Sequence, residues 1–138
     1  MRETSTIQVS RLGHIAIAVP SLELALKFYL ETFECEVSDP VDIPKQNIRI
    51  AYVKFSNINI ELMQPISSDS AITKFLDRNS LGGIHHFCLS TPDVVTATKT
   101  AKLKNIRVIG EGVSHDNKGL FFLHPKDAHG SLIEIEED

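Results

Sequence analysis

Two histidines and two glutamates recur at matched spacings in this chain of 138 residues, and together they have the chemistry of a metal site. His14 lies 47 residues before Glu61 (61 − 14), and His86 lies 48 residues before Glu134 (134 − 86). The segments that begin at the two histidines resemble each other at an offset of 72 residues (86 − 14). A tandem duplication that supplies one imidazole and one carboxylate in each copy predicts a divalent metal ion between the copies.

The alternation of side chains along a strand selects one of two adjacent histidines as the candidate ligand. His85 and His86 must point to opposite faces of their strand. His86 aligns with His14, and in both copies the residues two and four positions later are small, which leaves room for an ion and a ligand. His85 falls on the other face, with Phe87 and Leu89, and we interpret it as a structural residue.

The two glutamates lie within apolar strands. Glu61 and Glu134 are each flanked on both sides by isoleucine or leucine. A carboxylate on an inner strand is costly unless it is paired or bound to a metal. Two imidazoles and two carboxylates suit an octahedral Co, Ni, Mn, Fe or Zn ion with open positions for water or substrate. His14, Glu61, His86 and Glu134 are therefore the predicted metal ligands.

Hydrophobic periodicity predicts the same order of elements in both copies. In the first copy we expect a strand, an amphipathic helix and three strands, over residues 12–19, 22–33, 35–43, 48–55 and 57–64. In the second copy we expect the same elements over residues 84–90, 93–104, 106–110, 119–124 and 131–136, with a mobile loop over 110–119.

The fold class that follows is α+β, with two tandem β-α-β-β-β modules that form a cupped mixed sheet around the metal site. We expect one domain over residues 11–138, with module one at 11–66, a linker helix at 69–80 and module two at 83–137.

Composition and charge exclude several classes of protein. The net charge of −4 and the lack of a basic run give no reason to expect a nucleic-acid partner. No apolar stretch approaches membrane length, so we expect no membrane partner. The chain shows no signal or transit segment and has only two cysteines, so we expect the cytoplasm, or the mitochondrial matrix in a eukaryote.

Basic residues and one further histidine offer contacts for an anionic ligand. The candidate cations are Lys45, Arg49, Lys54, Lys118 and Lys126. His124 stands where a predicted strand ends. It contacts a ligand or stabilises the turn, and the sequence leaves both interpretations open.

Several segments carry a resemblance to a known family. The His…Glu…His…Glu pattern in paired modules resembles the vicinal oxygen chelate (glyoxalase) superfamily. Residues 13–20, 60–65, 82–86 and 122–127 look more narrowly like the methylmalonyl-CoA epimerase family. The resemblance covers residues 11–137, which is nearly the whole chain.

This resemblance implies a glyoxalase-like fold around one divalent ion, usually cobalt, and a homodimer. It implies inversion at C2 of an acyl-CoA substrate, methylmalonyl-CoA, through an enolate. Glu134 is a candidate acid/base group, and Lys126 and His124 are candidate substrate-binding residues of the matching 122–127 segment.

The chain departs from the family at two places. Lys45, in Pro-Lys-Gln-Asn, stands where the family usually has its second glutamate base. A lysine abstracts a proton only where burial or a nearby cation keeps it neutral. Residues 114–117 read Ser-His-Asp-Asn where the family has a Gly-Ala-His-Gly loop.

Two other functions therefore stay open at this stage. One is a glyoxalase-type lyase or isomerase that acts on a thiol adduct. The other is a metal-retaining protein that binds acyl-CoA with weak activity, which the replacement by Lys45 favours.

Overall fold

The computed structural model describes residues 6–138 and divides into two compact units. The first unit comprises residues 14–85, and the second comprises residues 86–138 together with the segment up to Gly13. Each unit contains a sheet and repeats the order strand, helix, strands, which confirms the predicted α+β fold of two β-α-β-β-β modules.

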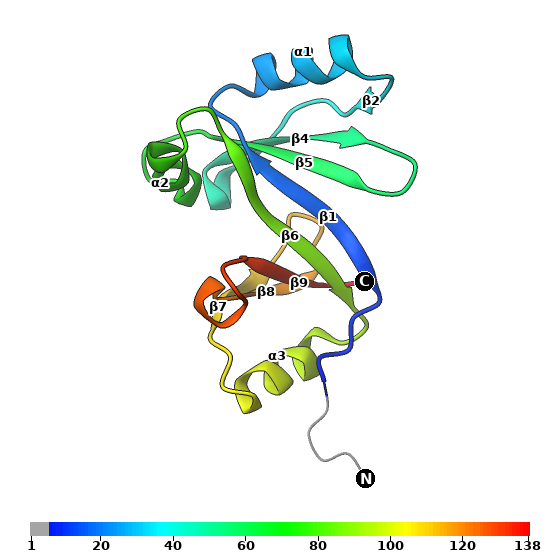
Figure 1. The fold of residues 1–138 in the computed structure, drawn as a ribbon, viewed down its shortest axis with the longest axis vertical. Coiled ribbons are helices and arrows are strands. Elements are labelled where there is room, and N and C mark those ends of the chain that lie inside the picture. Colours follow the sequence, from blue (N-terminus) through cyan, green and yellow to red (C-terminus); the bar gives the residue numbers. More distant parts are fainter. Residues whose placement is uncertain (1–5) are drawn as a thin grey trace. The chain divides into compact units, whose positions relative to one another are not determined.

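In the first unit one sheet has the order β2-β4-β5-β1, and β3 also pairs with β4 (Figure 1). Strand β5 runs parallel to β1 and antiparallel to β4. The elements are β1 (Arg11–Ala18, of which His14 onward belongs to this unit), α1 (Leu22–Thr32), β2 (Glu36–Val37), β3 (Val41–Ile43), β4 (Ile48–Lys54), β5 (Asn59–Pro65) and α2 (Ala71–Arg78).

Alternation along the strands of the first unit separates two apolar clusters. One cluster, with Leu22 of α1, contains Val53 and Leu62. The other cluster, with Ile72 of α2, contains Ala16 and Met63. Burial of each large aliphatic side chain contributes roughly 1.5–3 kcal/mol to stability, so the two helices fix opposite faces of this sheet.

Polar caps fix where α1 begins. The hydroxyl of Ser21 accepts a hydrogen bond from the Leu24 amide at 3.2 Å, and Oε1 of Gln64 accepts one from the Leu22 amide at 2.6 Å. Such caps satisfy amides that lack an intrahelical partner. The second of them ties the helix to the end of β5.

The second unit repeats this topology in the order β6-β9-β8-β7, with β6 parallel to β9 and β8 antiparallel to both of its neighbours. Its elements are β6 (Gly83–Thr91, of which His86 onward belongs to this unit), α3 (Val94–Leu103), β7 (Val108–Val113), β8 (Gly119–Leu123) and β9 (Ile133–Glu137).

Asp93 caps α3 as Ser21 caps α1. Its two carboxylate oxygens accept hydrogen bonds from the amide and the hydroxyl of Thr96, at 3.1 and 2.8 Å. These bonds stabilise the charged carboxylate and lower the pKa of Asp93. The matching caps show that the duplication preserves the start of the helix as well as the strands.

The segment before β1 packs against the second unit. Ile7 joins the apolar cluster around Phe121. The amide of Ser10 donates to the Ser90 carbonyl at 2.8 Å, and the Thr91 hydroxyl donates to the Gln8 carbonyl at 2.8 Å. The second unit is therefore built from two stretches that lie far apart in the sequence.

Two sequence-based expectations are wrong. The predicted loop over 110–119 is a β-hairpin, because β7 continues to Val113 across an irregular register between Ile109 and Gly112. Its turn closes through a 2.8 Å bond from the Ser114 amide to the Lys118 carbonyl. The predicted strand over 35–43 is two short strands, β2 and β3, because Pro40 cannot donate to a ladder. Within residues 6–138 no helix has the length and apolar character to cross a bilayer.

Gly82 occupies a position that no other residue fits. Its φ is +94°, and a Cβ there would lie 2.6 Å from the Ala18 carbonyl oxygen. We expect Gly82→Ala to lower the free energy of unfolding by at least about 1–3 kcal/mol, because the strained backbone and the clash both oppose the folded state. Thermal and urea denaturation followed by circular dichroism measure this effect.

Two other glycines separate the causes. Gly130 has a φ of +88° but no atom within 4 Å of a built Cβ, so Gly130→Ala reports backbone strain alone. Gly112 has neither feature, and Gly112→Ala should change stability by less than about 1 kcal/mol. Equal losses for Gly82→Ala and Gly112→Ala would contradict the steric explanation.

Candidate functional site

The first unit brings His14 and Glu61 together on one face of its sheet. The parallel register pairs Ala16 of β1 with Glu61 of β5, and His14 lies two residues before Ala16 on the same face. Nε2 of His14 lies 3.6 Å from Oε1 of Glu61, and both side chains are largely buried. Strand pairing therefore places this imidazole diagonally against this carboxylate.

The second unit repeats the arrangement with His86 and Glu134. Cys88 of β6 pairs with Glu134 of β9, and His86 lies two residues before Cys88. Nε2 of His86 lies 3.0 Å from Oε1 of Glu134, and the side chains are only 5% and 7% exposed. The register that relates histidine to glutamate is the same in both units.

Each of these contacts requires a hydrogen or a cation between its two atoms. A carboxylate oxygen accepts hydrogen bonds, so it is attracted to Nε2 when that nitrogen carries a hydrogen, or when both atoms bind one cation. Nitrogen and oxygen ligands lie about 2.0–2.2 Å from a zinc-sized ion, which puts neighbouring ligand atoms of one ion about 3.0–3.5 Å apart. The 3.0 Å distance falls within this range and the 3.6 Å distance lies just above it, so each nitrogen and oxygen pair is close to the spacing of two ligands of one divalent ion.

The adjacent histidines of β6 have different surroundings. The ring of His86 meets Phe122 edge-on, with centroids 5.2 Å apart. The ring of His85 meets Phe75 of α2 in the same way at 5.1 Å. His85 thus packs against the linker helix, whereas His86 faces a carboxylate.

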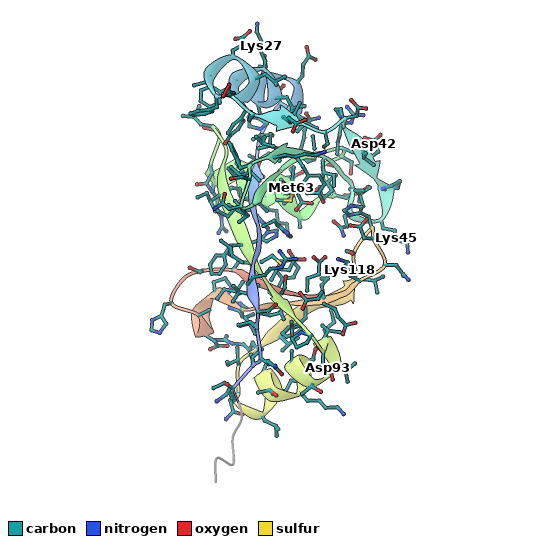
Figure 2. All side chains as sticks on the ribbon, turned by 90° about the vertical axis from the view of Figure 1, so that its right-hand side faces the viewer. Lys27, Asp42, Lys45, Met63, Asp93 and Lys118 are labelled. Carbon is teal, nitrogen blue, oxygen red and sulfur yellow. The ribbon has the colours of Figure 1, made fainter. Side chains whose placement is uncertain are left out.

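Lys45 lies in a 3₁₀ turn, Pro44–Gln46, between β3 and β4. Its side chain is exposed, and Figure 2 shows it at the edge of the first unit, whereas Met63 lies in the interior. Nearby, Nε of Arg49 donates to Asp42 at 2.6 Å, which lowers the pKa of that carboxyl. Arg49, one of the predicted anion-binding cations, therefore has a carboxylate partner.

His124 and Lys126 lie in the turn that follows β8. Nδ1 of His124 accepts a hydrogen bond from the Lys126 amide at 3.0 Å, and His124 is the N-cap of the 3₁₀ turn Pro125–Asp127. The Lys126 side chain is exposed. Arg107 donates twice to Asp127 at 2.8 and 3.0 Å, which holds the pKa of Asp127 well below its usual range. These contacts support the turn-stabilising interpretation of His124.

Sequence reasoning missed the aromatic residues opposite the glutamates. Tyr52 of β4 pairs directly with Glu61, and Phe122 of β8 pairs directly with Glu134. In a hairpin whose turn is Ser56-Asn57, the numbers of two paired residues add to 113 (56 + 57). The partner of Glu61 is then residue 52, so the pairing of Tyr52 with Glu61 could have been predicted from the sequence. The long connection between β8 and β9 gave no such signal for Phe122.

Comparisons with known proteins extend these observations. Residues 13–123 match the profile of the glyoxalase/bleomycin resistance protein/dioxygenase superfamily. Ethylmalonyl-CoA/methylmalonyl-CoA epimerase of Cereibacter sphaeroides is 39% identical, over 94% of this chain and 98% of that protein. The human mitochondrial methylmalonyl-CoA epimerase is 38% identical, over 96% of this chain and 77% of that protein.

The chain belongs to this superfamily and, within it, to the methylmalonyl-CoA epimerase family. A solved structure of Streptomyces coelicolor methylmalonyl-CoA epimerase, a variant in complex with 2-nitronate-propionyl-CoA, agrees with this membership. It superposes with a TM-score of 0.87 at 30% identity and covers 95% of this chain and 96% of that one. The expected resemblance to the epimerase family is therefore confirmed.

Metal analysis tests the four predicted ligands. Protein is reconstituted with Co²⁺, desalted and analysed by inductively coupled plasma mass spectrometry. It should retain about one ion per chain, because the two histidine–glutamate pairs together supply four donors. His86→Ala should lose most of the metal, and chelation should lower the melting temperature, since an ion that binds only the folded state stabilises it.

His85→Ala is the matched control, because it changes the neighbouring histidine of the same strand and leaves the Glu134 contact in place. It should retain the metal. Loss of metal in His85→Ala together with retention in His86→Ala would refute the assignment of His86.

Proposed function

We propose that the chain inverts the configuration at C2 of methylmalonyl-CoA, with one divalent ion held by His14, Glu61, His86 and Glu134. The observation that carries this proposal is the repeated pair: each unit holds one imidazole nitrogen within 3.6 Å of one carboxylate oxygen through the same strand register. The epimerases among the relatives support the substrate.

The bound ion would supply electrostatic stabilisation of the negative charge that develops on the substrate when C2 loses its proton. Cobalt is the proposed ion, because nitrogen and oxygen donors suit it and the family implies it. Inversion then requires one group to take the proton from one face of C2 and another group to return a proton to the opposite face.

Glu134 is the proposed acid/base group on one face of C2. Its side chain is only 7% exposed, and a carboxylate held away from bulk water can exchange a proton with a bound substrate. The 3.0 Å contact with His86 fixes one of its oxygens, Oε1.

Lys45 is the proposed group on the opposite face. A lysine ammonium donates a proton to an enolate readily but cannot abstract one, so it serves the return of the proton better than its removal. Because Lys45 would be a poor base, a second candidate function stays in the proposal: an acyl-CoA-binding protein with weak turnover. The epimerase relatives make a glyoxalase-type reaction the less supported alternative.

Lys126 and His124 are the proposed substrate-binding residues. The ammonium of Lys126 is exposed and can pair with the phosphates of coenzyme A, and His124 fixes the turn that presents it. A homodimer is also proposed, with two-fold symmetry as the commonest closed arrangement. We propose the cytoplasm as its compartment, in line with its two free thiols, Cys35 and Cys88.

Deuterium exchange tests the reaction directly. Cobalt-loaded protein is incubated with (2R)- or (2S)-methylmalonyl-CoA in deuterium oxide, and both C2 deuteration and inversion are followed. We expect the two to proceed together from the epimer whose C2 proton faces Glu134, and more slowly from the other epimer, whose C2 proton faces Lys45. Ethylmalonyl-CoA is compared in parallel, because one relative is named for both substrates. Metal-free protein gives the background, and a rate equal to that background would reject the epimerase assignment.

Substitution of Lys45 tests the second acid/base group. Lys45→Glu restores the carboxylate that the family usually has and should raise turnover at pH 7 by roughly 10²-fold or more, the typical contribution of a well-placed general base. Metal content should not change. Lys45→Gln, which removes the charge and supplies no base, is the control. A fast wild type whose rate is unchanged in Lys45→Gln would show that Lys45 takes no part in proton transfer.

A further inference from the structure

Helix α1 has an apolar side that faces away from its sheet. The helix packs on β2, β4 and β5 through residues such as Leu22 and Tyr29. Leu24 and Phe28, one turn apart, are 65% and 54% exposed. The ring of Phe28 meets Phe33 edge-on, with centroids 5.9 Å apart, and Phe33 is itself 48% exposed. Leu24, Phe28 and Phe33 together form the α1 patch.

The fold does not require large apolar side chains at these places. Helix α3 takes the place of α1 in the second unit, and the offset of 72 residues brings Thr96 and Thr100 to the positions of Leu24 and Phe28. A helix with two threonines there covers its sheet equally well. Adjoining exposed apolar side chains of this kind commonly mark an interaction surface.

A row of charged residues borders the α1 patch. Glu23, Lys27 and Glu31 follow one another at four-residue intervals, so they lie along one side of α1. Figure 2 shows Lys27 pointing away from the strands of the first unit. The row reads negative, positive, negative along the helix. It complements itself when a second copy of the helix lies antiparallel and shifted so that a lysine meets a glutamate.

We propose that the α1 patch is the contact surface of a homodimer, in which the α1 helices of two copies pack antiparallel about a two-fold axis near Ala25. Lys27 of each chain then lies opposite the partner's Glu23. Leu24 lies between the partner's Leu24 and the partner's Phe28. A two-fold axis makes every contact twice, so one arrangement forms two ion pairs and covers both patches. This inference rests on the proposed dimer and does not depend on the metal site.

The α1 patch belongs to the side of the sheet away from the predicted metal ligands of its unit. Leu62 of β5 packs in the apolar cluster with α1, whereas Met63 packs in the cluster with α2. Glu61 lies two residues before Met63 and so shares the face of Met63. Substitutions in the α1 patch therefore change association without touching the candidate site.

A charge within the α1 patch tests the surface. Analytical ultracentrifugation over a range of concentrations should show a wild-type dimer at micromolar concentration. Leu24→Glu should raise the dimer Kd by about 100-fold or more, because it would bury a carboxylate against an apolar partner surface. Val95→Glu is the matched control, since Val95 is an apolar residue of α3 that is 60% exposed. It should leave the Kd unchanged, and circular dichroism shows that both variants are folded.

Reversal of the charges tests the antiparallel arrangement. Lys27→Glu and Glu23→Lys each turn two attractive pairs into two repulsive pairs, and each should weaken its own dimer about 10-fold or more. An equal mixture of the two variants should recover a dimer of nearly wild-type affinity, because each variant supplies the charge that the other lacks. High salt should reduce these differences, since it screens exposed charges.

The outcomes decide the surface separately from the reaction. A monomeric wild type, or a Leu24→Glu dimer with the wild-type Kd, would overturn the assignment of the α1 patch. A mixture of the two charge variants that stays as weak as either variant alone would overturn the antiparallel arrangement. C2 exchange is measured on the same wild-type samples. A wild type that dimerises as expected and exchanges no C2 proton would reject the epimerase and leave this surface in place.

Discussion

The structure depends on a cross-strand contact that is made once in each unit, between the Nε2 of a histidine and a carboxylate oxygen of a glutamate. Both contacts are made by largely buried side chains on the face of a sheet, where a charge without a partner would be strongly unfavourable. The pairing of β1 with β5 and of β6 with β9 fixes their geometry, so a shift of one residue in either pair would turn the glutamate to the opposite face. Helix packing on the apolar clusters then holds the register.

Much of this could be predicted from the sequence because the duplication supplies a second copy of every signal. Side-chain alternation separated His85 from His86, and the helix caps at Ser21 and Asp93 were visible as residue types. The hairpin of β7 and β8 was not visible, because two glycines and an irregular register hide its alternation. Tyr52 was overlooked because an aromatic residue within a strand usually indicates the core.

The remaining asymmetry between the units concerns chemistry more than architecture. Their topology and their helix caps match, yet one carboxylate faces a phenol and the other faces a phenyl ring. A duplicated scaffold tends toward two equivalent half-sites, whereas an acid/base reaction at a single carbon needs groups with different tasks. Lys45 is a further chemical difference between the units, because it lies in a 3₁₀ turn that connects the paired strands β3 and β4 of the first unit.

The segment that precedes β1 has a consequence for how the protein is made. Residues 14–85 are one uninterrupted stretch and can complete their contacts as soon as they leave the ribosome. Ser10, by contrast, bonds to Ser90 and Asp138, which are 80 and 128 residues away. The second unit is therefore completed only when its later part binds a segment that was synthesised first. Such distant contacts slow folding, so closure of the second unit is expected to limit the rate at which the whole chain matures.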